Sequence, residues 1–148
     1  MFKKILVPID GGEPSNAAIR AACAFARETG ARLIFYYAKP GYCPAYVSGE
    51  MVMGDFGIDQ AFTSAMDKQA KALLAKAAET ASEAGVACET LSTECDAPYE
   101  GIIAAAEDQA CDLIFMASHG RRGVSALLLG SETQRVLTHG KIPVLIYR

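Results

Sequence analysis

The chain has 148 residues, of which 51% are hydrophobic and 21% charged, and its formal net charge at pH 7 is −3. These values fit a single domain, residues 1–148, large enough to bury its own apolar core. They do not favour a nucleic-acid partner, because nucleic acids are bound by clustered lysines and arginines. In this chain adjacent basic residues occur only as short pairs, such as Arg121-Arg122.

The N-terminus and the cysteines favour a cytoplasmic protein. The apolar run that follows Lys4 is shorter than the roughly 7–15 residues of a secretory leader, and no apolar stretch approaches the ~20 residues of a membrane span. We therefore expect no membrane partner. The cysteines form no Cys-x-x-Cys pair and no Cys/His metal spacing, so we expect reduced thiols. They are Cys23, Cys43, Cys88, Cys95 and Cys111.

The first part of the chain alternates short apolar runs with an Ala-rich stretch of helical period. Residues 4–9 are predicted to form a strand that ends in a turn cluster. A helix with Pro14 in its first turn follows and stops at Gly30. Residues 32–38 are predicted to form a second strand.

The middle of the chain holds a long segment without a clear period. Residues 39–60 contain two prolines and four glycines, and we interpret them as a loop. Loops of this length in compact domains are usually functional or mobile. A long helix is predicted over residues 62–84, ending at Gly85, and a third strand over residues 86–93.

The last part of the chain repeats the alternation. We expect Asp96 to cap a helix, followed by a strand over residues 113–117. Ser131-x-x-Gln134 matches a capping box that opens another helix, and a fifth strand is predicted over residues 142–147. Strands that are apolar on both faces and separated by helices indicate an α/β fold, a parallel sheet covered on both sides.

The most informative motif follows the fourth predicted strand. Gly120 and Gly130 are separated by nine residues, and Ser131 comes next at the start of a helix. Glycines let backbone amides approach a ligand closely, and a helix N-terminus adds unpaired N–H groups and a positive dipole. This combination can hold a polyphosphate.

The segment resembles the signature of the ATP-binding branch of the universal stress protein family, Gly-x-x-Gly, nine residues, Gly-Ser/Thr. The first glycine is replaced by Ala117, whose methyl group disfavours positive φ by roughly 1–2 kcal/mol. If φ at this position is negative, little is lost. The resemblance covers the whole chain, including the end of the first strand at Val7-Pro8-Ile9-Asp10.

The resemblance implies a single-domain, doubly wound, five-stranded parallel sheet of the adenine-nucleotide alpha hydrolase-like type. Its strand order would be 3-2-1-4-5, with helices on both faces. Ligands of such sheets bind beyond the strand ends where the winding reverses, here between the first and fourth strands. The implied site consists of Pro8, Ile9, Asp10, Ala38, Met116, Ala117, His119, Gly120, Arg121, Arg122, Gly123, Gly130, Ser131, Glu132 and Thr133.

Several of these residues have a second interpretation. Asp10 matches the family's nucleotide-contacting aspartate, but it can also act as a turn or cap residue. Ser131 can cap its own helix or face a phosphate. Arg121 and Arg122 can pair with phosphates or remain solvated. His119 has no neighbour in sequence that would complete a catalytic group, and we interpret it as structural or phosphate-proximal.

The family resemblance implies binding of ATP, with Mg²⁺ on the phosphates, as a signal in the stress response. Besides Asp10, only Glu132 offers a carboxylate at the phosphate end, so we predict no catalytic residues and no efficient hydrolysis. Two alternatives remain open: a dimeric interaction protein that binds no nucleotide, and a slow ATPase.

The fifth predicted strand is apolar on both faces and would lie at an edge of the sheet. Such an edge invites pairing with another chain, and a closed two-fold dimer satisfies it without fibre growth. The resemblance implies a homodimer formed through Val144, Leu145 and Ile146.

Overall fold

The computed structural model of the chain describes residues 1–41, 56–120 and 129–148, with side chains from residue 60 onward in its second helix. Within these residues, strands and helices alternate along the chain. They are β1 (Lys4–Pro8), α1 (Glu13–Thr29), β2 (Arg32–Lys39), α2 (Phe56–Glu83), β3 (Cys88–Glu94), α3 (Pro98–Asp108), β4 (Leu113–Ala117), α4 (Ser131–His139) and β5 (Val144–Tyr147).

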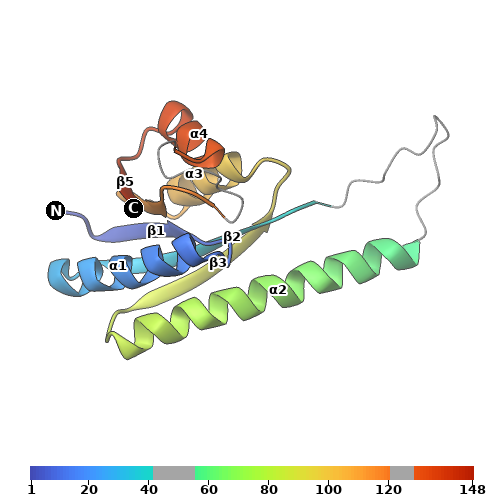
Figure 1. The fold of residues 1–148 in the computed structure, drawn as a ribbon, viewed down its shortest axis with the longest axis horizontal. Helices are drawn as coiled ribbons and strands as arrows, with labels where there is room; N and C mark the ends of the chain where they lie inside the picture. Colours follow the sequence, from blue (N-terminus) through green and yellow to red (C-terminus); the bar gives the residue numbers. More distant parts are fainter. Residues whose placement is uncertain (42–55, 121–128) are drawn as a thin grey trace.

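The strands form one parallel sheet in the order β3-β2-β1-β4-β5, as the family resemblance implied. Helices α1 and α2 cover one face of the sheet, and α3 and α4 cover the other (Figure 1). Leu6 in β1 is in register with Ile34 on one side and Ile114 on the other. The predicted fold class is therefore confirmed.

The core has two layers because the sheet is covered on both faces. Ile5 and Val7 of β1 pack with α1 and α2, whereas Leu6 between them packs with α3 and α4. This is why β1 reads as a continuous apolar run rather than an alternating one. The edge strand β3 departs from this pattern, since Glu89 and Thr90 are exposed.

The second helix is longer than the sequence indicated. It begins at Phe56, not at residue 62, and β2 extends to Lys39, so the predicted loop over residues 39–60 is too long at both ends. Before Ala70, no residue of α2 whose side chain is described is buried, and the side chains of residues 56–59 lie outside those described. The remainder of the predicted loop, residues 42–55, lies outside the described residues.

Both predicted N-caps are wrong. The cap of α3 is Ala97 rather than Asp96, and the cap of α4 is Gly130, which makes Ser131 the first helical residue. Neither helix start has a side-chain cap of its own. The α3 N-terminus is instead satisfied from the neighbouring helix, because the Tyr99 N–H donates to Glu132 Oε2 at 2.8 Å.

Burial perturbs the ionisable groups of the core. Desolvation, with a smaller contribution from Cys88, raises the pKa of the Cys23 thiol to about 11. Desolvation likewise raises the pKa of Cys111 to about 11, and that of the Tyr36 hydroxyl to about 12. These groups stay protonated at neutral pH. Among the described helices, none is long and apolar enough to cross a membrane.

We expect the free energy of unfolding to fall as pH rises from about 9 to about 11, the window between the ordinary and the folded thiol pKa values. The folded chain holds these protons more tightly than the unfolded chain, so unfolding releases protons in this window. Each thiol then costs up to ~1.4 kcal/mol of stability per pH unit.

Urea denaturation at pH 8, 9.5 and 10.5 measures this slope. The double variant Cys23→Ala/Cys111→Ala should be less stable at pH 8, because it loses buried volume, but its stability should decline less steeply with pH. Equal slopes in the variant and the wild type would contradict the assignment.

Candidate functional site

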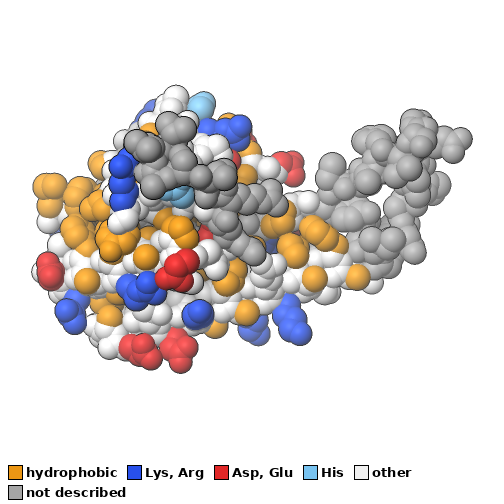
Figure 2. Space-filling view, in the orientation of Figure 1, with side chains coloured by type: hydrophobic (Ala, Val, Ile, Leu, Met, Phe, Trp, Pro, Cys, Tyr) orange, Lys and Arg blue, Asp and Glu red, His pale blue; other side chains and the backbone are white. Residues whose placement is uncertain are grey.

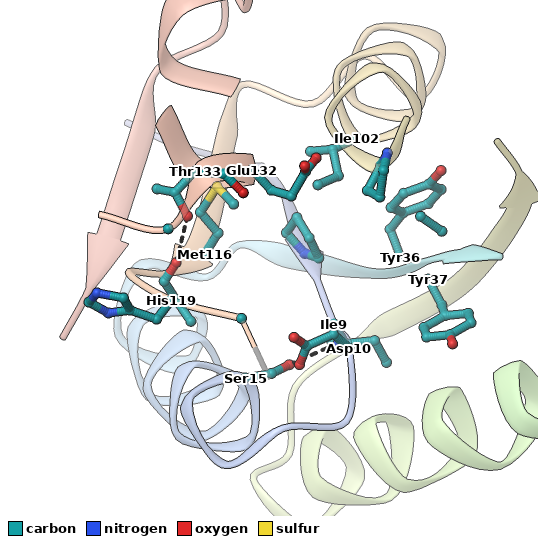
Figure 3. A pocket seen from close by; sticks show the side chains of 17 residues that line it. Ile9, Asp10, Ser15, Tyr36, Tyr37, Ile102, Met116, His119, Glu132 and Thr133 are labelled. Carbon is teal, nitrogen blue, oxygen red and sulfur yellow. Dashed lines mark hydrogen bonds between the residues drawn. The ribbon is translucent and has the colours of Figure 1, made fainter. Parts of the chain in front are cut away.

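A cavity of about 710 Å³ opens at the carboxyl ends of β1 and β4, where the strand order reverses. Figure 3 shows the residues that line it, from segments that are far apart in the sequence. Every described residue of the predicted site is among them: Pro8, Ile9, Asp10, Ala38, Met116, Ala117, His119, Gly120, Gly130, Ser131, Glu132 and Thr133. Arg121, Arg122 and Gly123 lie outside the described residues.

Asp10 ends β1 and borders the cavity with its carboxylate. Its Oδ1 accepts the Gly12 N–H at 2.8 Å, and its own N–H donates to Ser15 Oγ at 3.2 Å, so Asp10 does form the turn that begins α1. The other oxygen, Oδ2, faces the glycine segment. A Cβ on Gly120 would lie 3.0 Å from it. The carboxylate therefore has a structural side and a side that borders the cavity.

The end of β4 is joined to the start of α4 by two hydrogen bonds. The Gly130 N–H donates to the Ser118 carbonyl at 2.8 Å, and Thr133 Oγ1 donates to the Ala117 carbonyl at 3.2 Å. A Cβ on Gly130 would lie 3.3 Å from both the Ser118 carbonyl oxygen and His119 Cα. Glycine at this position thus permits the close approach of the two segments.

Ala117 replaces the first glycine of the family signature without backbone strain. Among the described non-glycine residues, only Ala110 has a positive φ. The condition under which the methyl group costs little, a negative φ at Ala117, is therefore met.

The N-terminus of α4 presents backbone donors to the cavity. The first hydrogen bond within the helix runs from the Gln134 N–H to the Gly130 carbonyl at 3.0 Å. The N–H groups of residues 131–133 therefore have no partner inside the helix, and Gly130 has no side chain with which to cap them. Such a helix end attracts anions through these groups and through the helix dipole.

His119 is paired with its neighbour rather than with a catalytic carboxylate. Its Nδ1 lies 2.9 Å from Ser118 Oγ, and its Nε2 is a buried atom without a hydrogen-bond partner in the described part of the chain. In Figure 3 the imidazole lies at the margin of the cavity, away from Asp10. Within the described ranges, no third group orients this pair as nucleophilic catalysis would require.

The sequence did not indicate five further lining residues. Tyr36 and Tyr37 come from the end of β2 and point to opposite faces of the sheet (Figure 3). The Tyr36 hydroxyl lies 2.6 Å from Thr93 Oγ1. Their position beside Ala38 is the signal that would have found them, since β2 pairs with β1. The five residues are Ser15, Tyr36, Tyr37, Pro98 and Ile102.

Glu132, the second residue of α4, adds a carboxylate to the cavity. Its Oε2 accepts the Tyr99 N–H, and its Oε1 lies 3.4 Å from Arg135 Nη1. The lining within the described ranges holds two carboxylates, those of Asp10 and Glu132, and no lysine or arginine. In the same part of the chain, no three His, Cys, Asp or Glu side chains are grouped so as to hold a metal ion.

Comparison with known proteins places this site in context. The universal stress protein YxiE of Bacillus subtilis is 31% identical over 150 residues, with 100% of both chains covered. A universal stress protein of Thermus aquaticus is 32% identical over 148 residues, again with 100% of both covered.

Three solved structures share the fold. That of the hypothetical protein MJ0577 has a TM-score of 0.81 at 25% identity, covering 99% of this chain and 95% of that one. A universal stress protein in complex with cAMP has a TM-score of 0.71 at 24% identity, covering 99% and 97%. One from Archaeoglobus fulgidus in complex with dAMP has a TM-score of 0.66 at 17% identity, covering 99% and 98%.

The match extends to the family as a whole. The model of the universal stress protein family matches residues 1–148, in agreement with the full-length relatives and the shared strand order. The chain therefore belongs to the universal stress protein family.

Proposed function

We propose that this protein binds ATP, with Mg²⁺ on the phosphates, in the cavity between the ends of β1 and β4. In this role it acts as a nucleotide-dependent stress-response protein of the cytoplasm. The observation that carries the proposal is the meeting of two kinds of group in one cavity. The Asp10 carboxylate lines one part of it, and the unpaired amides at the start of α4 line another.

The residues present suit a nucleotide. Asp10 lines the cavity, and a carboxylate there can accept hydrogen bonds from ribose hydroxyls. The amides of residues 131–133 and the Ser131 hydroxyl supply donors for phosphate oxygens. Apolar side chains of Ile9, Ile102 and Met116 provide the surface that a base requires, and the volume of about 710 Å³ lies within the usual range for ligand sites.

Relatives of known structure support the ligand class. Two solved universal stress proteins with the same fold are complexes with cAMP and dAMP, which are both adenine nucleotides. The proposal extends this class to ATP because Gly120, Gly130 and Ser131 resemble the signature of the ATP-binding branch of the family, and the amides of residues 131–133 lie beside them as donors.

The contacts of the two lining carboxylates, Asp10 and Glu132, favour binding of ATP without efficient hydrolysis. An ATPase positions a water molecule with a free acceptor group. Both lining carboxylates serve as structural acceptors at helix starts, Glu132 for the Tyr99 N–H and Asp10 Oδ1 for the Gly12 N–H, which favours a positioning role over activation of water. Release of inorganic phosphate from ATP above the buffer rate would instead favour the slow ATPase.

The most direct test is mass spectrometry of nucleotide that survives gentle purification, together with the shift in melting temperature on addition of ATP. We expect a bound adenine nucleotide and a higher melting temperature. If the folded protein shows neither a bound nucleotide nor a higher melting temperature, the result would favour the alternative of an interaction protein that binds no nucleotide.

We also propose that the protein forms a homodimer through β5. The carbonyls of Pro143 and Tyr147 accept hydrogen bonds from β4, so by alternation the backbone groups of Val144 and Ile146 point to the open edge. Figure 2 shows hydrophobic side chains gathered at the end of the molecule where β5 lies. Tyr147 in this strand is 39% exposed. A two-fold pairing of β5 strands would cover both the edge and these side chains.

Gly130→Val should lower ATP affinity by at least tenfold while the protein stays folded. The backbone at Gly130 has φ −59° and ψ 149°, which valine adopts readily, but its Cβ would press on Ser118 and His119 where the phosphates are proposed to bind. Isothermal calorimetry measures the affinity. Thr138→Val, at an exposed position of the same helix, is the control and should bind as the wild type does. Equal affinities in all three proteins would contradict the proposed site.

Ala117→Gly restores the family signature and should change ATP affinity by less than about threefold. The negative φ at Ala117 means that the methyl group imposes no backbone strain that glycine would relieve. Calorimetry on the two proteins, with thermal denaturation as a check on folding, decides the point. A tenfold gain would show that the methyl group obstructs the ligand directly.

Ile146→Pro should convert the dimer to a monomer at micromolar concentration. Proline removes an N–H that points to the open edge and leaves the hydrogen bonds to β4 in place. Ile146→Ala shortens the side chain without touching the N–H and should remain largely dimeric. Light scattering coupled to size exclusion measures the mass of each, and a monomeric wild type at the same concentration would refute the dimer.

A further inference from the structure

The cavity contains a negative charge at a place where a phosphate ligand would need a positive one. Glu132 is the second residue of α4, so it lies within the set of amides proposed to bind phosphate. In Figure 3 its carboxylate lies between the start of α4 and the side of the cavity formed by Ile102. Any anion at this helix end therefore has a carboxylate of the protein as its neighbour.

The interactions of Glu132 do not cancel its charge. The ion pair with Arg135 is long, at 3.4 Å, and the Arg135 side chain is 54% exposed, so solvent screens most of this attraction. The Tyr99 N–H is a neutral donor that stabilises the carboxylate but carries no full charge. With 36% of its side chain exposed, Glu132 remains an anion bordering the cavity.

We infer that Glu132 is a specificity-determining residue that ranks ligands by their phosphate charge. The Glu132 carboxylate lowers affinity for a free triphosphate more than for a monophosphate, and a nucleoside is unaffected by it. The triphosphate binds well only when a divalent cation has neutralised part of its charge. This inference rests on the proposed nucleotide site and specifies the form of ligand that the site takes.

A purely structural role for Glu132 makes a different prediction. Its carboxylate caps the N-terminus of α3 and so holds α3 against α4. Loss of that contact would move the cavity wall and would alter the binding of all ligands in the same direction. A charge effect, in contrast, grows with each phosphate group on the ligand.

The test is a ligand series of adenosine, AMP, ADP and ATP, measured by calorimetry in EDTA at low salt. Glu132→Gln keeps an oxygen that can accept from the Tyr99 N–H but removes the charge. We expect affinity for ATP to rise about five- to tenfold, for ADP about threefold and for AMP about twofold, with adenosine unchanged. Thermal denaturation confirms that the variant is folded.

Glu100→Gln is the matched control. Glu100 is an exposed carboxylate in the first turn of α3, bonded to the Tyr99 hydroxyl at 2.8 Å, and it does not line the cavity. The substitution changes the net charge by the same amount, but at the start of α3 rather than at the start of α4. It should alter the ATP affinity by less than about twofold.

Two further conditions distinguish the electrostatic effect of Glu132 from its structural role. Excess Mg²⁺ should reduce the gain of Glu132→Gln for ATP to less than about twofold, and 0.5 M NaCl should do the same, because both weaken the repulsion. A gain of equal size for adenosine and ATP, or one indifferent to Mg²⁺ and salt, would overturn the inference in favour of the structural role. Failure of every ligand to bind either protein would refute the proposed function instead.

Discussion

The reversal of winding between β1 and β4 is the constraint on which the rest of this molecule depends. The connections that leave these two neighbouring strands lead to opposite faces, α1 to one and α4 to the other (Figure 1). The connections from β1 to α1 and from β4 to α4 diverge just beyond the sheet. They leave a space that the side chains of the two strands do not fill. Pairing of Ile5 with Leu113 and of Leu6 with Ile114 fixes how far each strand reaches toward that space. The cavity is thus a consequence of topology, and the residues around it determine its chemistry.

The sequence predicted the sheet because burial on both faces leaves a strong pattern. β1 and β4 are runs of apolar residues that end in turn residues, and their boundaries follow from composition alone. The start of α2 was predicted too late, at residue 62 instead of Phe56, because the glycine-containing segment before it shows no clear period in the sequence. The cap of α3 was missed for another reason. The Tyr99 N–H at the start of this helix donates to Glu132 of a different helix, and a partner so far along the chain leaves no local sequence pattern.

The predictable part of the candidate site is the part carried by contiguous motifs. Asp10 and the residues from Met116 to Gly120 follow strand ends directly, so a family signature could locate them. Tyr36, Pro98 and Ile102 line the same cavity, but they belong to segments whose contribution depends on three-dimensional packing. The strand order by itself brings β2 beside β1. How far α3 extends over the cavity depends on its contact with α4, which the Glu132–Tyr99 hydrogen bond helps to set.

The cavity and the open edge of the sheet are connected through one residue. The Ser118 carbonyl accepts the Gly130 N–H at the start of α4, and the Ser118 N–H donates to the Tyr147 carbonyl in β5, each at 2.8 Å. A ligand that draws the N-terminus of α4 toward its phosphates would act on the first of these bonds. A second subunit paired with β5 would restrain the strand that holds the other. Both hydrogen bonds are made by the backbone of Ser118, which is almost fully buried, at 6% exposure. A shift of the start of α4 or of β5 would therefore move Ser118. The start of α4 and the edge strand β5 are therefore linked by a continuous path of hydrogen bonds through Ser118, the residue that follows β4.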